Sequence, residues 1–169
     1  MRANRSEPKT APATPKVAIV VTSGCDGEST LQIKEALSAE GAVPRLVGIT
    51  MGRASSINSP TLDIEVSMDA AASVPWDAMV IPNGEAAIEI LLDSGKAHAF
   101  LKDQYQHRKP ILLLGKAHSL LDVAGISPKL ANGAEDPRLL VYPSNDTTAA
   151  ITAFMDKLAM TRQREHAQV

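Results

Sequence analysis

The stretch Pro110-Ile-Leu-Leu-Leu-Gly-Lys-Ala-His118 decides how the chain folds. Its apolar run has no alternating pattern, which is typical of a strand that is buried on both faces of a sheet. Gly115 then permits a sharp turn into a short helical pattern, which we expect from Ala117 to Ala124. The stretch therefore predicts a strand, an elbow and a helix, the unit from which α/β domains are built.

The elbow is also the place where such folds carry catalytic groups. In enzymes of this build the turn residue is a Ser or Cys, held above the sheet among backbone N–H groups. Here the turn consists of Gly115, Lys116 and Ala117, so we expect a vacant elbow and no catalytic residue. We interpret His118 as a surface or supporting histidine. No other His stands at metal-ligand spacing from it, so we expect no metal site.

The flanking sequence repeats the alternation of strand and helix. Leu62, Ile64 and Val66 alternate with acidic residues and predict a short strand at the sheet edge. A closing helix from Asp146 would place Ala150, Ile151, Phe154 and Leu158 on one stripe. We further predict strands at 16–22, 43–49, 77–82, 110–114 and 138–142, and helices at 28–40, 86–92 and 96–107. This order predicts a flavodoxin-like α/β fold, a doubly wound parallel sheet with helices on both faces, in a single domain.

The composition limits the possible functions. A chain of 169 residues with 44% hydrophobic content is enough for one domain with its own core. Because 17 basic and 19 acidic residues give a net charge of −2, we expect neither nucleic acid nor a membrane as a partner. One Cys excludes an internal disulfide, and no apolar run approaches the roughly 20 residues that cross a bilayer. We therefore expect a cytoplasmic chain.

Cys25 lies in the predicted turn Gly24-Cys25-Asp26-Gly27 after the first strand, and two interpretations of it stay open. The positive end of the following helix would favour a thiolate and hence a redox-sensitive thiol. A small residue in a tight loop is the simpler interpretation, because neither His nor Lys is adjacent. The turn lacks the Gly-x-Gly-x-x-Gly spacing of a nucleotide site. Whether a small ligand binds near Cys25 and Gly84 stays open.

Arg138 and Tyr142 have the spacing of the proximal haem motif of catalase cores, in which a Tyr ligates the iron. That motif needs a helix, which places residues four apart on one face. Leu-Leu-Val-Tyr before Pro143 instead predicts a strand. We therefore expect no haem or other cofactor in this chain.

Several runs together resemble the C-terminal domain of large-subunit catalases. The runs that carry the resemblance are Lys16 to Val21, Gly24 with Asp26, Glu40 to Ala42, Trp76 to Gly84, Asp93 to Phe100 and Tyr105 to Ile111. The resemblance implies a flavodoxin-like domain of the DJ-1/PfpI and class I glutamine amidotransferase group over residues 16–165. Residues 1–15 would then be a disordered Pro-rich tail or linker to a haem-containing core, and 166–169 a tail.

The resemblance also implies a site that this sequence does not complete. In the DJ-1/PfpI relatives a Cys at the elbow works with a carboxylate near the start of the first helix. The position of that acid is Ser29 here, with Glu28 one residue out of register. Relatives commonly have a second Gly where this chain has Asn83.

We therefore expect a non-catalytic accessory domain that supports the stability and assembly of a haem catalase, whose core performs hydrogen peroxide detoxification. Its partners would be the catalase core or a second copy, contacted through the helix at 96–107 and the closing helix, which ends in Arg162, Arg164 and His166. Two alternatives remain: a stand-alone DJ-1/PfpI-like hydrolase, deglycase or glyoxalase, and a chaperone-like holdase in oxidative stress.

Overall fold

The structure of the chain is a computed structural model that describes residues 14–143 and 147–167, with side chains as far as residue 160. A six-stranded sheet with the order β5-β2-β1-β6-β7-β8 forms its centre, and all of its neighbouring strands are parallel. The strands are β1 (Lys16–Val20), β2 (Val43–Gly48), β5 (Val66–Ser67), β6 (Ala78–Ile81), β7 (Ile111–Leu114) and β8 (Leu139–Tyr142). The predicted parallel sheet is therefore confirmed.

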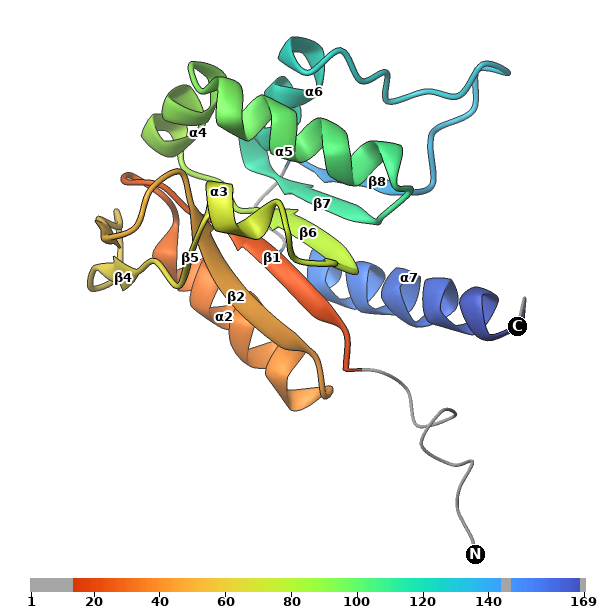
Figure 1. The fold of residues 1–169 in the computed structure, drawn as a ribbon, viewed down its shortest axis with the longest axis horizontal. Coiled ribbons are helices and arrows are strands. Elements are labelled where there is room, and N and C mark those ends of the chain that lie inside the picture. The colour runs from red at the N-terminus through yellow and green to blue at the C-terminus, as the bar shows by residue number, and fades with distance from the viewer. Residues whose placement is uncertain (1–13, 144–146, 168–169) are drawn as a thin grey trace, which may run out of the picture.

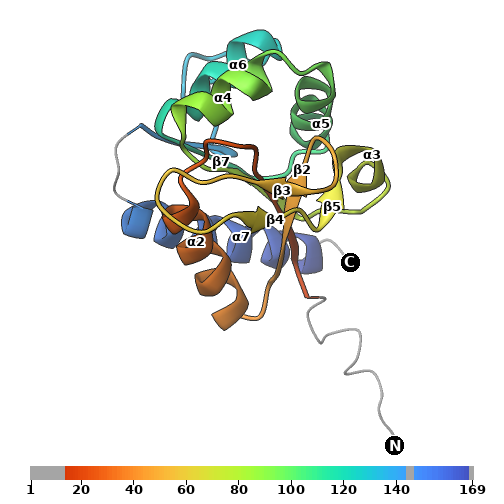
Figure 2. The ribbon, with the colours of Figure 1, turned by 90° about the vertical axis from the view of Figure 1, so that its left-hand side faces the viewer.

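Helices cover both faces of the sheet (Figures 1 and 2). One face carries α3 (Met68–Ala71), α4 (Glu85–Leu92), α5 (Gly95–Gln106) and α6 (Ser119–Val123), and the other carries α2 (Gly27–Ala39) and α7 (Thr147–Ala167). From β1 the chain crosses to β2 in one direction, and from β6 it crosses to β7 in the opposite direction. Because parallel crossovers are right-handed, the two directions place their helices on opposite faces. The strand order thus reverses between β1 and β6, where α/β folds bind ligands.

The core is built on the central strands. Every residue of β6 and β7 is buried, as expected for strands covered on both faces. Ile111 and Leu113 belong to the apolar cluster under α4, α5 and α6, whereas Leu112 and Leu114 belong to the cluster under α2 and α7. Alternate side chains of one strand therefore hold the two helical layers, and each fully buried Leu contributes about 1.5–3 kcal/mol.

The closing helix is confirmed where the structure describes it. Ala150, Ile151, Phe154 and Leu158 are all buried against the sheet. Its predicted first residue, Asp146, lies outside the described residues, as do the Pro-rich residues 1–13 and the side chains of Arg162, Arg164 and His166. The helix continues to Ala167, past the expected end of the domain at residue 165.

The predicted edge strand at Leu62 to Val66 is wrong as a single element. β4 (Leu62–Asp63) pairs antiparallel with β3 (Arg53–Ala54) in a separate two-stranded sheet, and only β5 joins the main sheet. Alternation reports which face of a segment is buried, and Leu62 and Ile64 are indeed buried. It does not report which strand the backbone pairs with.

Two local helical elements also differ from the expectation. The predicted helix after the elbow divides into a 3₁₀ turn, η1 (Gly115–His118), and the short α6. Helix α3 was not predicted; its N-cap Ser67 accepts a hydrogen bond from the backbone N–H of Ala70 at 3.3 Å. Neither difference moves a strand, so the elbow keeps its predicted place at the end of β7.

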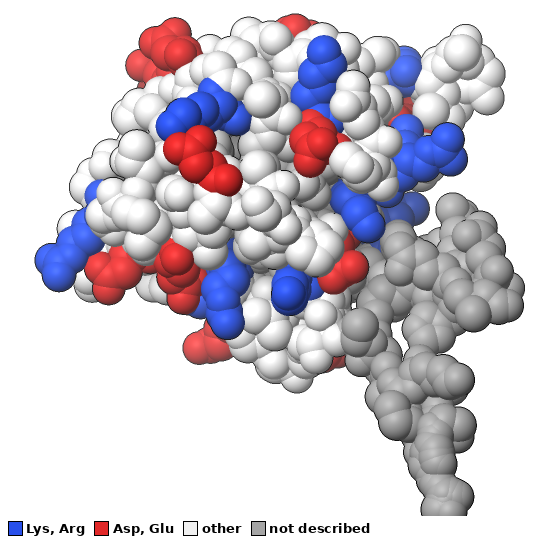
Figure 3. All heavy atoms as spheres, in the orientation of Figure 1, with Lys and Arg blue, Asp and Glu red and all other residues white. Residues whose placement is uncertain are grey.

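The surface carries no single-sign region on the face that Figure 3 shows. Basic and acidic side chains are interspersed there between wide uncharged areas. Among the described residues, no helix is long and apolar enough to span a membrane.

Candidate functional site

The elbow lies at the carboxyl end of β7, beside the position where the strand order reverses. Gly115 has a φ of 60°, in the left-handed region that favours glycine. The exposed side chain of Lys116 reaches Glu85, with 3.1 Å between Nζ and Oε2. Ala117 is fully buried in the cluster under α4, α5 and α6. The three turn residues thus present no hydroxyl or thiol above the sheet, and the Lys116 amine is paired with Glu85.

Asn83 occupies the space above Gly115. A Cβ atom at Gly115 would overlap Cγ, Oδ1 and Nδ2 of Asn83. The same Asn83 Oδ1 accepts a hydrogen bond of 3.2 Å from the backbone N–H of Lys116. Asn83 therefore fills the place where the first carbon of an elbow nucleophile would lie, and it also engages a backbone N–H of the turn. The sequence identified Asn83 as a departure from the relatives but gave no sign of this contact.

The two turns beside the elbow are in direct backbone contact. A Cβ at Gly84, whose φ is 137°, would lie 2.6 Å from Cα of Cys25. The N–H of Asp26 donates to the carbonyl oxygen of Asn83 at 2.9 Å. Gly84 is thus required by a close approach of the chain to the turn after β1. Whether a small ligand binds near Cys25 and Gly84 was left open; the space directly between these two residues is filled by backbone atoms.

Cys25 is buried, with 1% of its surface exposed. The segment after β2 covers it, because Ser55 and Ile57 both form backbone hydrogen bonds with the turn at Gly24 and Cys25. Burial raises the pKa of the Cys25 thiol, the negative charge of Asp26 raises it further, and a hydrogen bond from its own backbone N–H lowers it only in part. These surroundings favour the neutral thiol over the thiolate that a redox-sensitive Cys needs.

The position expected for a catalytic acid is engaged in a helix cap. Ser29 Oγ donates to Asp26 Oδ2 at 2.8 Å, and Asp26 Oδ1 accepts from Asn58 Nδ2 at 2.8 Å and from the N–H of Ser29 at 3.2 Å. Burial would raise the pKa of Asp26, but the hydrogen bonds from Asn58 and Ser29 outweigh it and lower the pKa. Glu28 is exposed. Asp26 is the N-cap of α2 and was not predicted from the sequence, although Asp is one of the residues favoured at this position.

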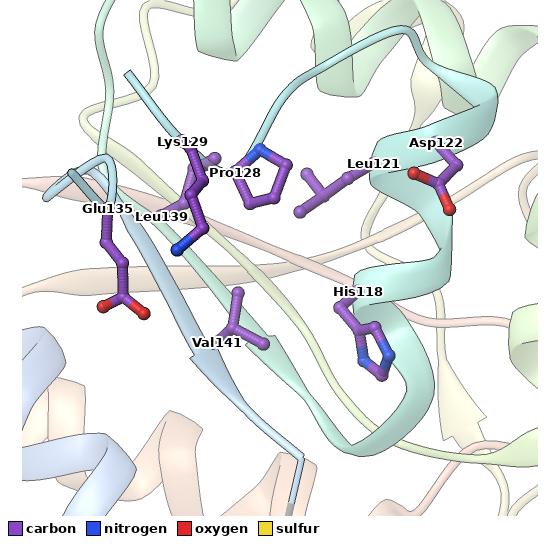
Figure 4. A pocket seen from close by; sticks show the side chains of 8 residues that line it. All are labelled: His118, Leu121, Asp122, Pro128, Lys129, Glu135, Leu139 and Val141. Atoms are coloured by element: carbon purple, nitrogen blue, oxygen red, sulfur yellow. The ribbon is translucent and has the colours of Figure 1, made fainter. Parts of the chain in front are cut away.

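His118 lines a hollow of about 320 Å³ on the side of β8 that faces α6. Figure 4 shows its ring across the floor residue Val141 from the side chains of Lys129 and Glu135. His118 Nδ1 lies 3.0 Å from the carbonyl oxygen of Gly115, which can only accept, so Nδ1 carries the proton in this contact. The residue is exposed, in agreement with its interpretation as a surface histidine.

Arg138 and Tyr142 do not share a helix face. β8 is a strand, as predicted, and Tyr142 packs partly buried against the cluster under α2 and α7. Arg138 binds the buried carboxylate of Asp136 through Nε at 3.0 Å and through Nη2 at 2.9 Å. Tyr105 donates its hydroxyl to the same carboxylate at 3.0 Å. Arg138 therefore takes part in a contact that holds Tyr105 of α5 against the residues just before β8.

No metal centre is formed by the part of the chain that the structure describes. Within it, no group of three or more His, Cys, Asp or Glu residues could hold a metal ion.

Comparison with known proteins gives a consistent result. The family described as the C-terminal domain found in long catalases matches residues 13–166. Catalase HPII of Pseudomonas putida is 35% identical over 98 residues, which are 58% of this chain and 14% of that protein. Catalase-1 of Neurospora crassa is 28% identical over 137 residues, which are 78% of this chain and 19% of that protein. The chain thus spans less than a fifth of the length of these relatives.

Solved structures of low sequence identity share the fold. A two-domain protein of Anabaena variabilis with DJ-1/ThiJ/PfpI-like and ferritin-like domains has a TM-score of 0.77 at 16% identity, covering 86% of this chain and 48% of that one. DJ-1beta of Drosophila melanogaster has a TM-score of 0.75 at 14% identity, covering 92% of this chain and 97% of that one. The flavodoxin-like DJ-1/PfpI fold that the sequence resemblance implied is confirmed.

Proposed function

Because this chain belongs to the family of C-terminal domains found in long catalases, we propose that it is a non-catalytic accessory domain that supports the stability and assembly of a catalase. The haem and the disproportionation of hydrogen peroxide then belong to the catalase core, which the relatives contain in the part of their length that this chain does not match. The partner of the domain is that core.

The observation that carries this proposal is the packing of Asn83 onto Gly115. An acyl-transfer or thiol enzyme of this fold needs a nucleophile at the elbow and an activating group beside it. Gly115 has no side chain, and Asn83 fills the space that one would use. Near the start of α2, the Asp26 carboxylate is committed to Ser29 and Asn58. This argues against the alternative of a hydrolase, deglycase or glyoxalase.

Two measurements test the proposal. The first assays the purified chain for peroxide disproportionation and for glyoxalase, deglycase and amidase turnover, with Cys25→Ser as the control for the single thiol. We expect no turnover above background in either protein. Turnover that disappears in Cys25→Ser would show that the buried thiol is catalytic and would refute the non-catalytic part of the proposal.

The second measurement adds the chain to a long catalase whose own C-terminal domain has been removed. We expect the added chain to slow the heat inactivation of the core in a saturable, salt-sensitive way, because interfaces between domains of one chain are modest and polar. An unrelated α/β domain of equal size controls for crowding. Absence of protection at every ratio, together with a strictly monomeric sedimentation profile, would refute the supporting role.

A further inference from the structure

Three asparagines lie in the part of the chain that the structure describes, and each precedes a residue with a small side chain or none. The dipeptides are Asn58-Ser59, Asn83-Gly84 and Asn132-Gly133. In such sequences the backbone nitrogen of the second residue can attack Cγ of the Asn side chain, and Gly hinders this approach least because it has no Cβ. The structure places the three asparagines in different surroundings, so their reactivities should differ.

Asn58 is exposed, but both ends of its amide are held. Its Nδ2 donates to Asp26 Oδ1 at 2.8 Å, and its Oδ1 accepts from the N–H of Glu28 at 3.0 Å. The N–H of Ser59, which would have to attack, donates to Ser56 Oγ at 3.1 Å. Opening these bonds would also leave the first turn of α2 without a partner for one of its N–H groups.

Asn83 is held by the packing of the elbow. Its Oδ1 accepts from the N–H of Lys116 at 3.2 Å, and its carbonyl oxygen accepts from the N–H of Asp26 at 2.9 Å. A Cβ at Gly84 would lie 2.6 Å from Cα of Cys25. The peptide between Asn83 and Gly84 therefore cannot rotate unless the turns after β1, β6 and β7 separate.

Asn132 lies in the loop that connects α6 to β8 on the outside of the molecule (Figure 1). Every residue from 127 to 135 is exposed. An antiparallel bridge between Lys129 and Glu135 closes the loop, and Figure 4 shows the side chains of these two residues at the hollow that His118 lines. Asn132 and Gly133 form part of the tip beyond this bridge.

The hydrogen bonds of the tip join neighbouring residues. The N–H of Leu130 donates to the carbonyl oxygen of Ala134 at 2.7 Å, and the N–H of Gly133 donates to the carbonyl oxygen of Leu130 at 2.9 Å. The N–H of Ala134 donates to Asn132 Oδ1 at 3.0 Å. Because these bonds stay within an exposed loop, the tip can open for much less free energy than the whole fold.

One of these bonds also favours attack on the Asn132 side chain. Negative charge develops on Oδ1 when a nitrogen attacks Cγ, and the N–H of Ala134 already points at this oxygen. Only the bond from Gly133 to Leu130 has to break before the Gly133 nitrogen is free to react.

We propose that Asn132 is a deamidation site of the folded chain, with water as the co-reactant. The nitrogen of Gly133 forms a bond to Asn132 Cγ and gives up its proton to solvent. The bond from Cγ to Nδ2 breaks, Nδ2 takes up a proton from solvent, and ammonia leaves. Water then opens the resulting cyclic imide at one of its two carbonyl groups, which yields either an aspartyl or an isoaspartyl residue.

The modification changes the charge of the loop and, in part, its backbone. The new carboxylate takes the net charge of the chain from −2 to −3. The isoaspartyl product also adds one methylene group to the main chain between the bridge residues Lys129 and Glu135. The site does not depend on the proposed accessory function, and modified chains can be separated from unmodified ones by their charge.

The test incubates the whole purified chain, folded, in heavy-oxygen water at mildly alkaline pH and follows its peptides by mass spectrometry. Heavy oxygen in a new carboxyl group shows that the conversion took place during the incubation. We expect Asn132 to convert at least about tenfold faster than Asn83 and Asn58, because local opening of the loop is enough. Equally slow conversion of all three, or earlier conversion of Asn83 or Asn58, would overturn the proposal.

The chain unfolded in guanidinium chloride is the matched control. Asn83 and Asn132 both precede Gly, so they should convert at similar rates once the fold no longer separates them. An undiminished difference between them in the unfolded chain would show that the local sequence, and not the structure, selects Asn132.

A variant gives a second readout by ion-exchange chromatography. Asn132→Gln should remove the more acidic form that appears first in the folded wild type, because the longer side chain closes a less favourable ring. The exposed position tolerates the added methylene. Appearance of the acidic form at the wild-type rate in Asn132→Gln would refute the site.

Discussion

The elbow at Gly115 and the C-terminal end of α5 differ in whether their side-chain oxygens have hydrogen-bond partners. At the elbow the side chain of Asn83 fills the space over Gly115, and its Oδ1 is paired with the N–H of Lys116. At the end of α5, Oε1 of Gln104 is buried and has no hydrogen-bond partner among the described residues. The elbow turn is thus filled and paired, whereas one buried acceptor on α5 is left without a partner.

The elbow shows how a turn without a nucleophile can be filled by a neighbouring side chain. The turns after β1, β6 and β7 pack closely together, because Gly84 and Gly115 lie against Cys25 and Asn83. Under the proposed function, a domain built in this way contacts its partner through its surface.

The largest effect is expected at Asp136, whose carboxylate is paired with Arg138 and Tyr105. Asp136→Ala should lower the free energy of unfolding by about 3 kcal/mol, since it leaves a partly buried guanidinium unpaired. Gln104→Leu, at the residue before Tyr105, should lower the free energy of unfolding only slightly or raise it, since it removes an acceptor that has no partner. Urea unfolding of both variants measures the contrast. Equal losses would mean that Gln104 is paired in solution like Asp136.

A smaller loss is expected at the elbow. Gly115→Ala should cost about 2 kcal/mol, because the left-handed backbone disfavours a Cβ and because that Cβ meets Asn83. Adding Asn83→Gly should recover the part that is due to the overlap. Gly125→Ala is the matched control, since its φ of 73° is also left-handed and, apart from its chain neighbours, no described atom lies within 4 Å of its added Cβ. Additive losses in the double variant would contradict the contact between Asn83 and position 115.

Acid should reduce the stability that the Asp136 carboxylate contributes. Burial raises the pKa of Asp136, but its hydrogen bonds to Arg138 and Tyr105 outweigh burial and lower the pKa. A lowered carboxyl pKa stabilises the fold above the unfolded value of about 3.9, and this contribution is lost as the pH falls through the folded pKa. The free energy of unfolding should therefore fall less steeply below about pH 4 in Asp136→Asn than in the wild type. Parallel curves would show that Asp136 does not titrate with folding.

The last prediction concerns the reactivity of the Cys25 thiol and not the stability of the fold. Its raised pKa and its burial should make native alkylation by iodoacetamide more than about tenfold slower than that of free cysteine at pH 8. Unfolding in urea should restore the normal rate. Rapid alkylation of the folded chain would show that the segment over Cys25 opens and would revive the redox-sensitive interpretation.

The sequence predicts much of the fold, because uninterrupted apolar runs report strands buried on both faces. Ile111 to Leu114 could be assigned in this way, and Gly115 marked the turn. The segment at 62–66 could not, since alternation determines a buried face and not a pairing partner. The four-residue helix α3 is too short for a periodic pattern to appear.

For the candidate site, the sequence predicted only which catalytic groups are missing from the turn. Gly115, Lys116 and Ala117 show from their residue types alone that the turn has neither a hydroxyl nor a thiol. The contact between Asn83 and Gly115 joins two loops that are far apart in the sequence, and no local pattern announces it. That Gln104 Oε1 has no partner among the described residues is likewise a property of its surroundings, because the sequence shows only an amphipathic position on α5.

The central claim is that this domain supports a catalase through its surface and not through its elbow. The most direct measurement places the chain, in place of the native C-terminal domain, on the core of a long catalase such as Catalase HPII of Pseudomonas putida, and follows the half-life of peroxide activity at elevated temperature. We predict that the chimera outlives the core alone and that Lys116→Ala, which changes the exposed side chain of the elbow, leaves the half-life unchanged. A chimera that loses activity as fast as the bare core would contradict the account.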